Sequence, residues 1–154
     1  KLTMKRRGHI IFDTSAIKLA ITTPALQAII LQYGLWAPKR LETEINSPSL
    51  VQSAVALIGR DEFEFIKDGL FQNITRFPRS VTKKYESSVI AILTQFGSPI
   101  HSGDVEYLSL CIAKKPCIFV TEDSGLLIEK LVAHLEKNYG IEVLDCERFI
   151  EQYC

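Results

Sequence analysis

The sequence lacks an excess of charge of either sign. Its 154 residues include 18 Lys and Arg and 18 Asp and Glu, so the formal net charge at pH 7 is zero. Any contact with nucleic acid must therefore come from local groups rather than from a positive field over the whole molecule. Long apolar runs are missing too, because Gln27, Gln32 and Gly34 interrupt the apolar stretch over residues 24–37. That stretch is too short to span a membrane, and we expect no membrane partner.

Close cysteine pairs are also absent. Cys111, Cys117, Cys146 and Cys154 are spaced 6, 29 and 8 residues apart, whereas zinc sites usually begin with a C-x-x-C pair. Cys111 and Cys117 lie in apolar runs and are expected to pack as small buried hydrophobes. The sequence leaves open whether any of the four forms a disulfide.

The length fits one domain that buries roughly 70% of the surface of its unfolded chain. Met4 is the only methionine, so we expect the domain to cover residues 4–154 and residues 1–3 to remain from expression. No signal-peptide pattern precedes the first apolar run, and we expect a cytoplasmic location.

Short apolar runs alternate with helical patterns along the chain. Strands are expected over residues 9–12, 35–37, 73–77, 117–121 and 141–144. Helices are expected over residues 16–21, 24–33, 38–46, 47–59, 61–71, 80–96, 103–113, 124–137 and 145–153. This alternation predicts an α/β fold with about five strands, mostly parallel and covered by helices on both faces.

Four acids occupy similar places in these predicted elements: Asp13, Glu44, Asp104 and Asp123. Each alone has an ordinary explanation, because an Asp at a helix start accepts backbone N–H bonds and gains ~0.3–1 kcal/mol from the helix dipole. Glu44 shares a helix face with Leu41 and Ile45, whereas Glu42 points about 200° away and is expected to face water.

Taken together, the four acids suggest a cation site. If the sheet changes direction between the first and fourth strands, Asp13 and Asp123 become neighbours at its carboxyl edge. Two carboxylates ~4 Å apart repel by ~4 kcal/mol at an effective dielectric of 20, so they must protonate, meet a basic side chain or bind a cation. Oxygen ligands without His or Cys favour Mg²⁺ or Mn²⁺.

Four pieces of the chain, in order, carry a family resemblance. They are IIFDTSAI near the amino end, PKRLETEI with its second Glu six residues after the proline, GDVEYLSLCIA, and TEDSGL after the fourth strand. With these pieces, the sequence resembles the PIN-domain ribonucleases, a nuclease family that includes many toxins of toxin–antitoxin pairs. The resemblance covers nearly the whole chain, although residues 46–100 match only in length.

The resemblance implies a three-layer α/β/α sandwich with strand order 3-2-1-4-5. It also implies that the protein is a hydrolase that cleaves single-stranded RNA with a metal-activated water. An antitoxin is then a potential partner. Asp13, Glu44, Asp104 and Asp123 would be the catalytic, metal-binding acids, and Thr14, Ser15 and Thr121 match small polar positions beside them. Ser124, directly after the fourth acid, is a further candidate for a supporting polar residue. One position departs from the family, because many relatives carry a basic residue where this chain has Ser124.

Several neighbouring residues remain secondary candidates. Lys39 and Arg40, at the start of the Glu44 helix, are expected near the site and are weak candidates for binding phosphate. Glu106 and Glu122 are alternative ligands if the predicted register is shifted, and His101 is a candidate base three residues before Asp104. The sequence leaves the identity of the base open.

Other α/β families fit less well. A dinucleotide-binding domain needs G-x-G-x-x-G after its first strand, and DTSAIKLA contains no glycine. A phosphorelay receiver, by its family's pattern, carries an acceptor Asp at the end of the third strand, which ITRF lacks. The remaining alternative is a non-catalytic PIN-like module that binds RNA or a partner protein.

An apolar stripe gives that alternative a possible surface. Phe63, Ile66, Leu70 and Phe71 recur at helical spacing and are expected to pack on the domain's own core. If they were exposed instead, they would form a patch for a second subunit in a homodimer or for another protein.

Overall fold

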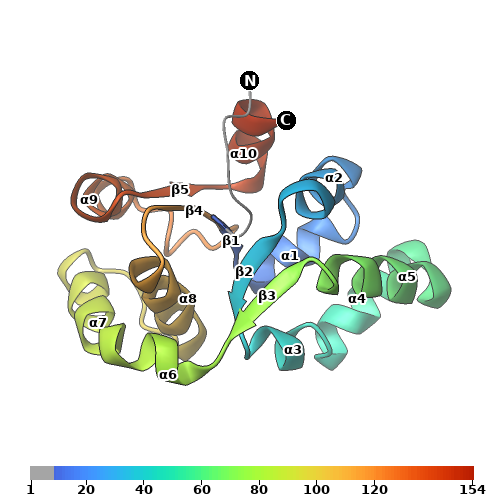
Figure 1. Ribbon diagram of the computed structural model, residues 1–154, viewed down its shortest axis with the longest axis horizontal. Helices are drawn as coiled ribbons and strands as arrows, with labels where there is room; N and C mark the ends of the chain where they lie inside the picture. Colours follow the sequence, from blue (N-terminus) through green and yellow to red (C-terminus); the bar gives the residue numbers. More distant parts are fainter. Residues whose placement is uncertain (1–8) are drawn as a thin grey trace.

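The structure is a computed structural model that describes residues 9–154, so the predicted domain start at Met4 lies outside the described residues. Five strands form one parallel sheet in the order β3-β2-β1-β4-β5 (Figure 1). The strands are β1 (Ile10–Phe12), β2 (Leu35–Pro38), β3 (Ile74–Phe77), β4 (Cys117–Val120) and β5 (Ile141–Leu144). Helices cover both faces, which confirms the three-layer α/β/α sandwich and its strand order.

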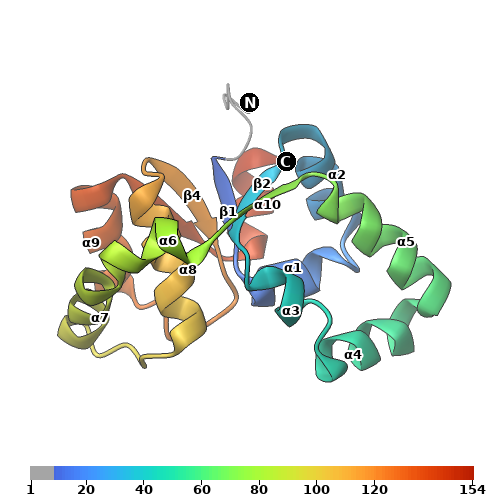
Figure 2. The same cartoon turned by 60° about the horizontal axis from the view of Figure 1, so that its bottom comes forward.

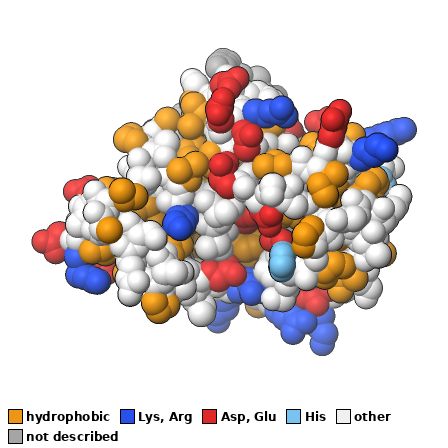
Figure 3. All heavy atoms as spheres, turned by 180° about the vertical axis from the view of Figure 1, so that it is seen from behind, with side chains coloured by type: hydrophobic (Ala, Val, Ile, Leu, Met, Phe, Trp, Pro, Cys, Tyr) orange, Lys and Arg blue, Asp and Glu red, His pale blue; other side chains and the backbone are white. Residues whose placement is uncertain are grey.

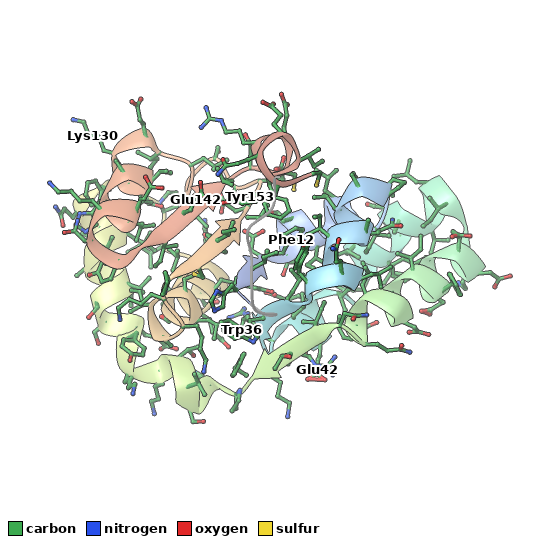
Figure 4. All side chains as sticks on the ribbon, turned by 45° about the horizontal axis from the view of Figure 1, so that its top comes forward. Phe12, Trp36, Glu42, Lys130, Glu142 and Tyr153 are labelled. Carbon is green, nitrogen blue, oxygen red and sulfur yellow. The ribbon has the colours of Figure 1, made fainter. Side chains whose placement is uncertain are left out.

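Strand β1 runs through the middle of the molecule and is buried on both faces. Ile10 and Phe12 belong to one apolar core, while Ile11, which points to the other face, belongs to the second. Phe12 lies near the centre of the molecule in Figure 4 and packs edge-on against Phe149, with ring centroids 5.5 Å apart. Burial on both faces explains why the strand is a continuous apolar run rather than an alternating one.

Each core is closed by its own set of helices (Figures 1 and 2). The first core is covered by α1 (Thr14–Ala20), α2 (Pro24–Tyr33) and α10 (Cys146–Tyr153), together with an arm made of α4 (Pro48–Ile58) and α5 (Arg60–Phe71). The second is covered by α7 (Glu86–Gln95), α8 (Ser102–Ala113) and α9 (Glu129–Tyr139).

The segment after β2 differs from its prediction. Pro38 ends the strand instead of opening a helix, and α3 is a single turn over Leu41–Glu44. Lys39 continues the strand ladder, because its amide donates to the carbonyl of Phe77 at 2.8 Å. Ser47 is extended, as expected of a residue that precedes a proline, and this keeps α3 short.

The helix predicted over residues 80–96 is broken. It consists of α6 (Arg79–Thr82), the 3₁₀ turn η1 (Lys83–Tyr85) and α7. The buried Thr82 hydroxyl donates to the carbonyl of Arg79 at 3.2 Å, and such back-bonding from Ser or Thr bends helices. The periodicity of the apolar residues therefore spans the bend without revealing it.

The predicted apolar stripe on α5 packs against the protein's own core. Phe63 and Leu70 are buried, and Ile66 and Phe71 are partly buried against the same cluster. The exposed ring of this helix is instead that of Phe65, which is 78% exposed.

Within residues 9–154, no single helix is both long and apolar enough to cross a membrane. Helices α1 and α2 would satisfy the length and composition only as a pair, and they are bent by 112° relative to each other.

Candidate functional site

The four acids singled out in the sequence line one cavity of about 330 Å³. The other lining residues are Thr14, Ser15, Gly103 and Tyr107. Strands β1 and β4 are neighbours, with Phe12 paired to Val120, so the residues that follow them emerge side by side at the carboxyl edge of the sheet. Acidic side chains gather along the middle of the face seen in Figure 3.

Asp13 is the most deeply placed of the acids, at 4% exposure. It caps α1, with Oδ1 accepting hydrogen bonds from the Ala16 amide at 3.0 Å and the Ser15 hydroxyl at 2.6 Å. Its Oδ2 accepts from the Thr121 hydroxyl at 2.5 Å, which joins the ends of β1 and β4. Burial raises the pKa of Asp13, while the Ser15, Thr121 and Ala16 hydrogen bonds lower it and Asp123 raises it.

Asp104 lies in the first turn of α8, close to Asp123. Burial, the charge of Asp123 and a hydrogen bond to Asp123 raise the pKa of Asp104 to about 7, and the charges of Asp13 and Glu44 add to the effect. The negative charges of these neighbouring acids therefore all disfavour ionisation of the Asp104 carboxyl group near neutral pH.

Asp123 stands in a tight turn after β4. Its Oδ1 accepts from the Gly125 amide at 2.9 Å, and its own amide donates to the Thr121 hydroxyl at 3.0 Å. A Cβ at Gly125 would lie 3.1 Å from Pro99 Cδ and 3.2 Å from Asp123 Oδ1, so the turn has little room for a side chain. The helix predicted over residues 124–137 begins only at Glu129, after this turn, and ends at Tyr139.

Glu44 is held by three side chains. Its Oε1 accepts from the Thr14 hydroxyl at 2.5 Å and the Tyr107 hydroxyl at 3.2 Å, and its Oε2 accepts from Arg40 Nε at 3.0 Å. Arg40 also reaches Glu106 Oε1 at 3.3 Å. Arg40 thus joins two acids, one from the end of α3 and one from α8.

Two lining residues were not among the predicted site residues. Tyr107 is 2% exposed and follows Asp104 by three residues, so both side chains lie on one face of α8. That spacing is the signal that would have found it. Gly103 packs closely against the site, because a Cβ there would lie 3.5 Å from Glu44 Oε2.

The remaining candidates lie around this cavity rather than in its lining. Lys39, Ser124 and His101 are exposed, and His101 holds the cap position of α8 without a capping hydrogen bond from its side chain. Glu122 is exposed as well, and its Oε2 accepts from the Cys146 amide at 2.7 Å. Glu42, which was expected to face water, is half-buried like Glu44, and it lies toward the edge of the molecule in Figure 4.

The chemistry of the donor set fits a hard divalent cation. Asp13, Asp104 and Asp123 line one cavity, and Arg40 pairs with Glu44 and Glu106 rather than with these three. A cation would offset the repulsion that raises the Asp104 pKa, and carboxylate oxygens suit Mg²⁺ and Mn²⁺. Among residues 9–154, however, no three His, Cys, Asp or Glu side chains are already grouped closely enough to hold an ion.

Comparison of the chain with models of protein families and with curated proteins finds no match. Its function is therefore proposed from the geometry of the site and from the resemblance of its motifs.

Proposed function

We propose that the protein is a divalent-metal-dependent endoribonuclease of the PIN type. The observation that carries the proposal is the cavity at the carboxyl edge of the sheet, where Asp13, Glu44, Asp104 and Asp123 all contribute to the lining. Open α/β sheets place their ligands outside the carboxyl ends of the strands, where neighbouring connections diverge. In this sheet, that point lies between β1 and β4.

Asp13, Asp104 and Asp123 would hold Mg²⁺ or Mn²⁺. When bound, the metal would acidify an attacking water and offset the charge that builds on the phosphate. The water would lose a proton to solvent as its oxygen bonds to phosphorus, the ester bond to the ribose oxygen would break, and that leaving oxygen would take up a proton from solvent. Ser15 and Thr121 fix the orientation of the Asp13 carboxylate through its two oxygens.

Glu44 has a different role in this proposal from the three aspartates that would hold the metal. Thr14, Tyr107 and Arg40 engage both of its oxygens, so its carboxylate is held in one orientation. A carboxylate held in this way can orient a water molecule at the edge of the cavity, whereas direct metal binding would require it to exchange one of these partners.

The substrate of this proposal is single-stranded RNA, and the location is the cytoplasm. Cys111, Cys117 and Cys146 are buried free thiols, in keeping with a reducing compartment. A role as the toxin of a toxin–antitoxin pair belongs to the same proposal and rests on the motif resemblance alone.

The proposal is tested by incubating the protein with a labelled single-stranded RNA and Mn²⁺. We expect cleavage that chelator abolishes and that Asp104→Asn lowers by about 10²-fold or more, the scale of losing a group that stabilises charge or transfers a proton. Asp61→Asn is the matched control, because Asp61 is an exposed acid in the first turn of α5. Cleavage that survives both chelator and Asp104→Asn contradicts the proposal.

A second candidate function is a non-catalytic module that binds a partner protein. It is favoured by a cavity of about 440 Å³ between α2 and α5, whose lining includes Leu31 and Phe65. These side chains are 50% and 78% exposed. Absence of cleavage, combined with a rise in melting temperature on adding Mn²⁺, would favour a protein that kept the metal site without turnover.

A further inference from the structure

A second cavity adjoins the acidic one. It has a volume of about 220 Å³ and lies between α1 and α4. Ser15 lines both cavities, and its hydroxyl donates to Asp13 Oδ1 while accepting from the Glu122 amide at 2.9 Å. The two cavities therefore meet at a residue that touches the acidic site directly.

The cavity continues outward along one face of α1. Ser15, Lys18 and Leu19 line it from α1, where residues at this spacing share a helix face, and Thr22 lines it from the turn that follows the helix. The opposite wall comes from α4 and includes Leu57. Leu19 is 39% exposed and Leu57 is 73% exposed, so apolar surface faces solvent beside the acidic site.

Lys18 supplies the positive charge that Ser124 does not. It is exposed and lines this second cavity. None of the salt bridges in the described part of the chain involves Lys18, whereas Arg40 is taken up by Glu44 and Glu106. The other charged residue of the lining, Glu122, has one carboxylate oxygen occupied by the Cys146 amide.

We infer that this cavity binds the nucleotide next to the cleaved bond of a single-stranded nucleic acid. The phosphate lies at Lys18, and the base rests on Leu19 and Leu57. An extended single strand exposes both its phosphates and the faces of its bases to one groove, whereas a duplex keeps its bases stacked inside. The inference rests on the proposed function, because it takes the acidic cavity to be the place where the strand is cleaved.

Binding without cleavage is the test. Affinity for a fluorescent single-stranded RNA oligonucleotide is measured by anisotropy in chelator, over a series of salt concentrations. Lys18→Ala is expected to weaken binding several-fold and to reduce the salt slope by about 0.7, the value for one phosphate contact to a single strand. Leu57→Ser is expected to weaken binding without changing the slope.

Lys137→Ala is the matched control, since Lys137 is an exposed lysine in the last turn of α9. Binding that is equal in Lys18→Ala and Lys137→Ala overturns the inference, as does a wild-type protein that does not bind the oligonucleotide. Lys18 lies in the last turn of α1, so a purely structural role would lower the melting temperature of Lys18→Ala and leave RNA affinity unchanged, which also overturns it.

The two proposals can fail separately. Cleavage with Mn²⁺ that persists unchanged in Lys18→Ala, together with unchanged affinity, removes the nucleotide site and leaves the nuclease. Binding that depends on Lys18 in a protein that never cleaves RNA supports the nucleotide site and removes the nuclease. Dependence on Lys18 for a duplex of the same sequence, but not for the single strand, contradicts the single-stranded substrate.

Discussion

At the residue scale, the acids of the cavity differ in how they are stabilised. Asp13 accepts three hydrogen bonds and Glu44 accepts three, but burial and the neighbouring acids together raise the pKa of Asp104 to about 7. Asp104 is therefore the acid whose ionisation the folded protein opposes most plainly and the one on which a bound cation would have the clearest effect.

This difference predicts a pH dependence of stability in metal-free buffer. The folded pKa of Asp104 is above its ordinary value of 3.8, so between about pH 4 and 7 the folded state binds more protons than the unfolded state. Stability contributed by protonated Asp104 is present at low pH and is lost as pH rises toward 7. We expect Asp104→Asn to gain on the order of 1–2 kcal/mol relative to wild type between pH 4 and 8, after allowance for solvent screening.

Urea unfolding at several pH values, in the presence of chelator, measures this effect. Asp61→Asn serves again as the control and is expected to keep a constant difference from wild type. A difference between Asp104→Asn and wild type that does not change with pH would contradict the prediction.

At the element scale, Arg40 joins the short α3 turn to α8. Its guanidinium contacts Glu44 Oε2 at 3.0 Å and Glu106 Oε1 at 3.3 Å, and the side chain of Glu106 is only 11% exposed. Helix α3 has a single turn, so contacts of this kind, rather than its own hydrogen bonds, must hold Glu44 at the cavity.

Removing the arginine is expected to destabilise the protein. Arg40→Met leaves the nearly buried Glu106 without its cation, and we expect a loss of about 1–3 kcal/mol in the free energy of unfolding. The double variant with Glu106→Gln is expected to recover part of this loss, giving a coupling energy of about 0.5–2 kcal/mol in a double-mutant cycle. Losses that simply add would mean that the two side chains act independently.

At the scale of the whole molecule, the sheet and the α4–α5 arm are packed differently. Strand β1 is buried on both faces, whereas the arm packs on the first core with one side only and leaves Leu57 and Phe65 of its other side exposed. The arm extends away from the sheet in Figure 2.

We therefore expect the arm to open without global unfolding. In hydrogen–deuterium exchange, amides of residues 48–71 should exchange faster than those of β1, β4 and α8, because local opening of the arm exposes less buried apolar surface. Equal protection of the arm and the central strands would show that the molecule opens only as one unit.

The arrangement of the whole molecule could be predicted from the sequence better than its local details. The alternation of apolar runs and helical patterns predicted a parallel sheet covered on both faces, and the acids could be placed because strand ends meet at one edge. The break after Thr82 and the late start of α9 leave the apolar periodicity unchanged, so that periodicity could not reveal them. The three-residue spacing from Asp104 could have placed Tyr107 on the site face of α8, but local patterns could not have predicted its contact with Glu44, which lies 63 positions away in the chain.

The strand order also decides which strands are left open to other molecules. β3 and β5 form the two edges of the sheet, and unpaired edges can recruit strands from neighbouring molecules and start aggregation. On β3, the exposed Arg76 lies over the Phe71 ring at 4.9 Å, and Pro78, which has no amide hydrogen, follows the strand. On β5, Glu142 accepts hydrogen bonds from Tyr153 and Gln152, and its side chain lies beside Tyr153 in Figure 4. Charged side chains on both edge strands discourage edge-to-edge pairing of sheets from two molecules. This matters because the zero net charge of the chain provides no general repulsion between copies.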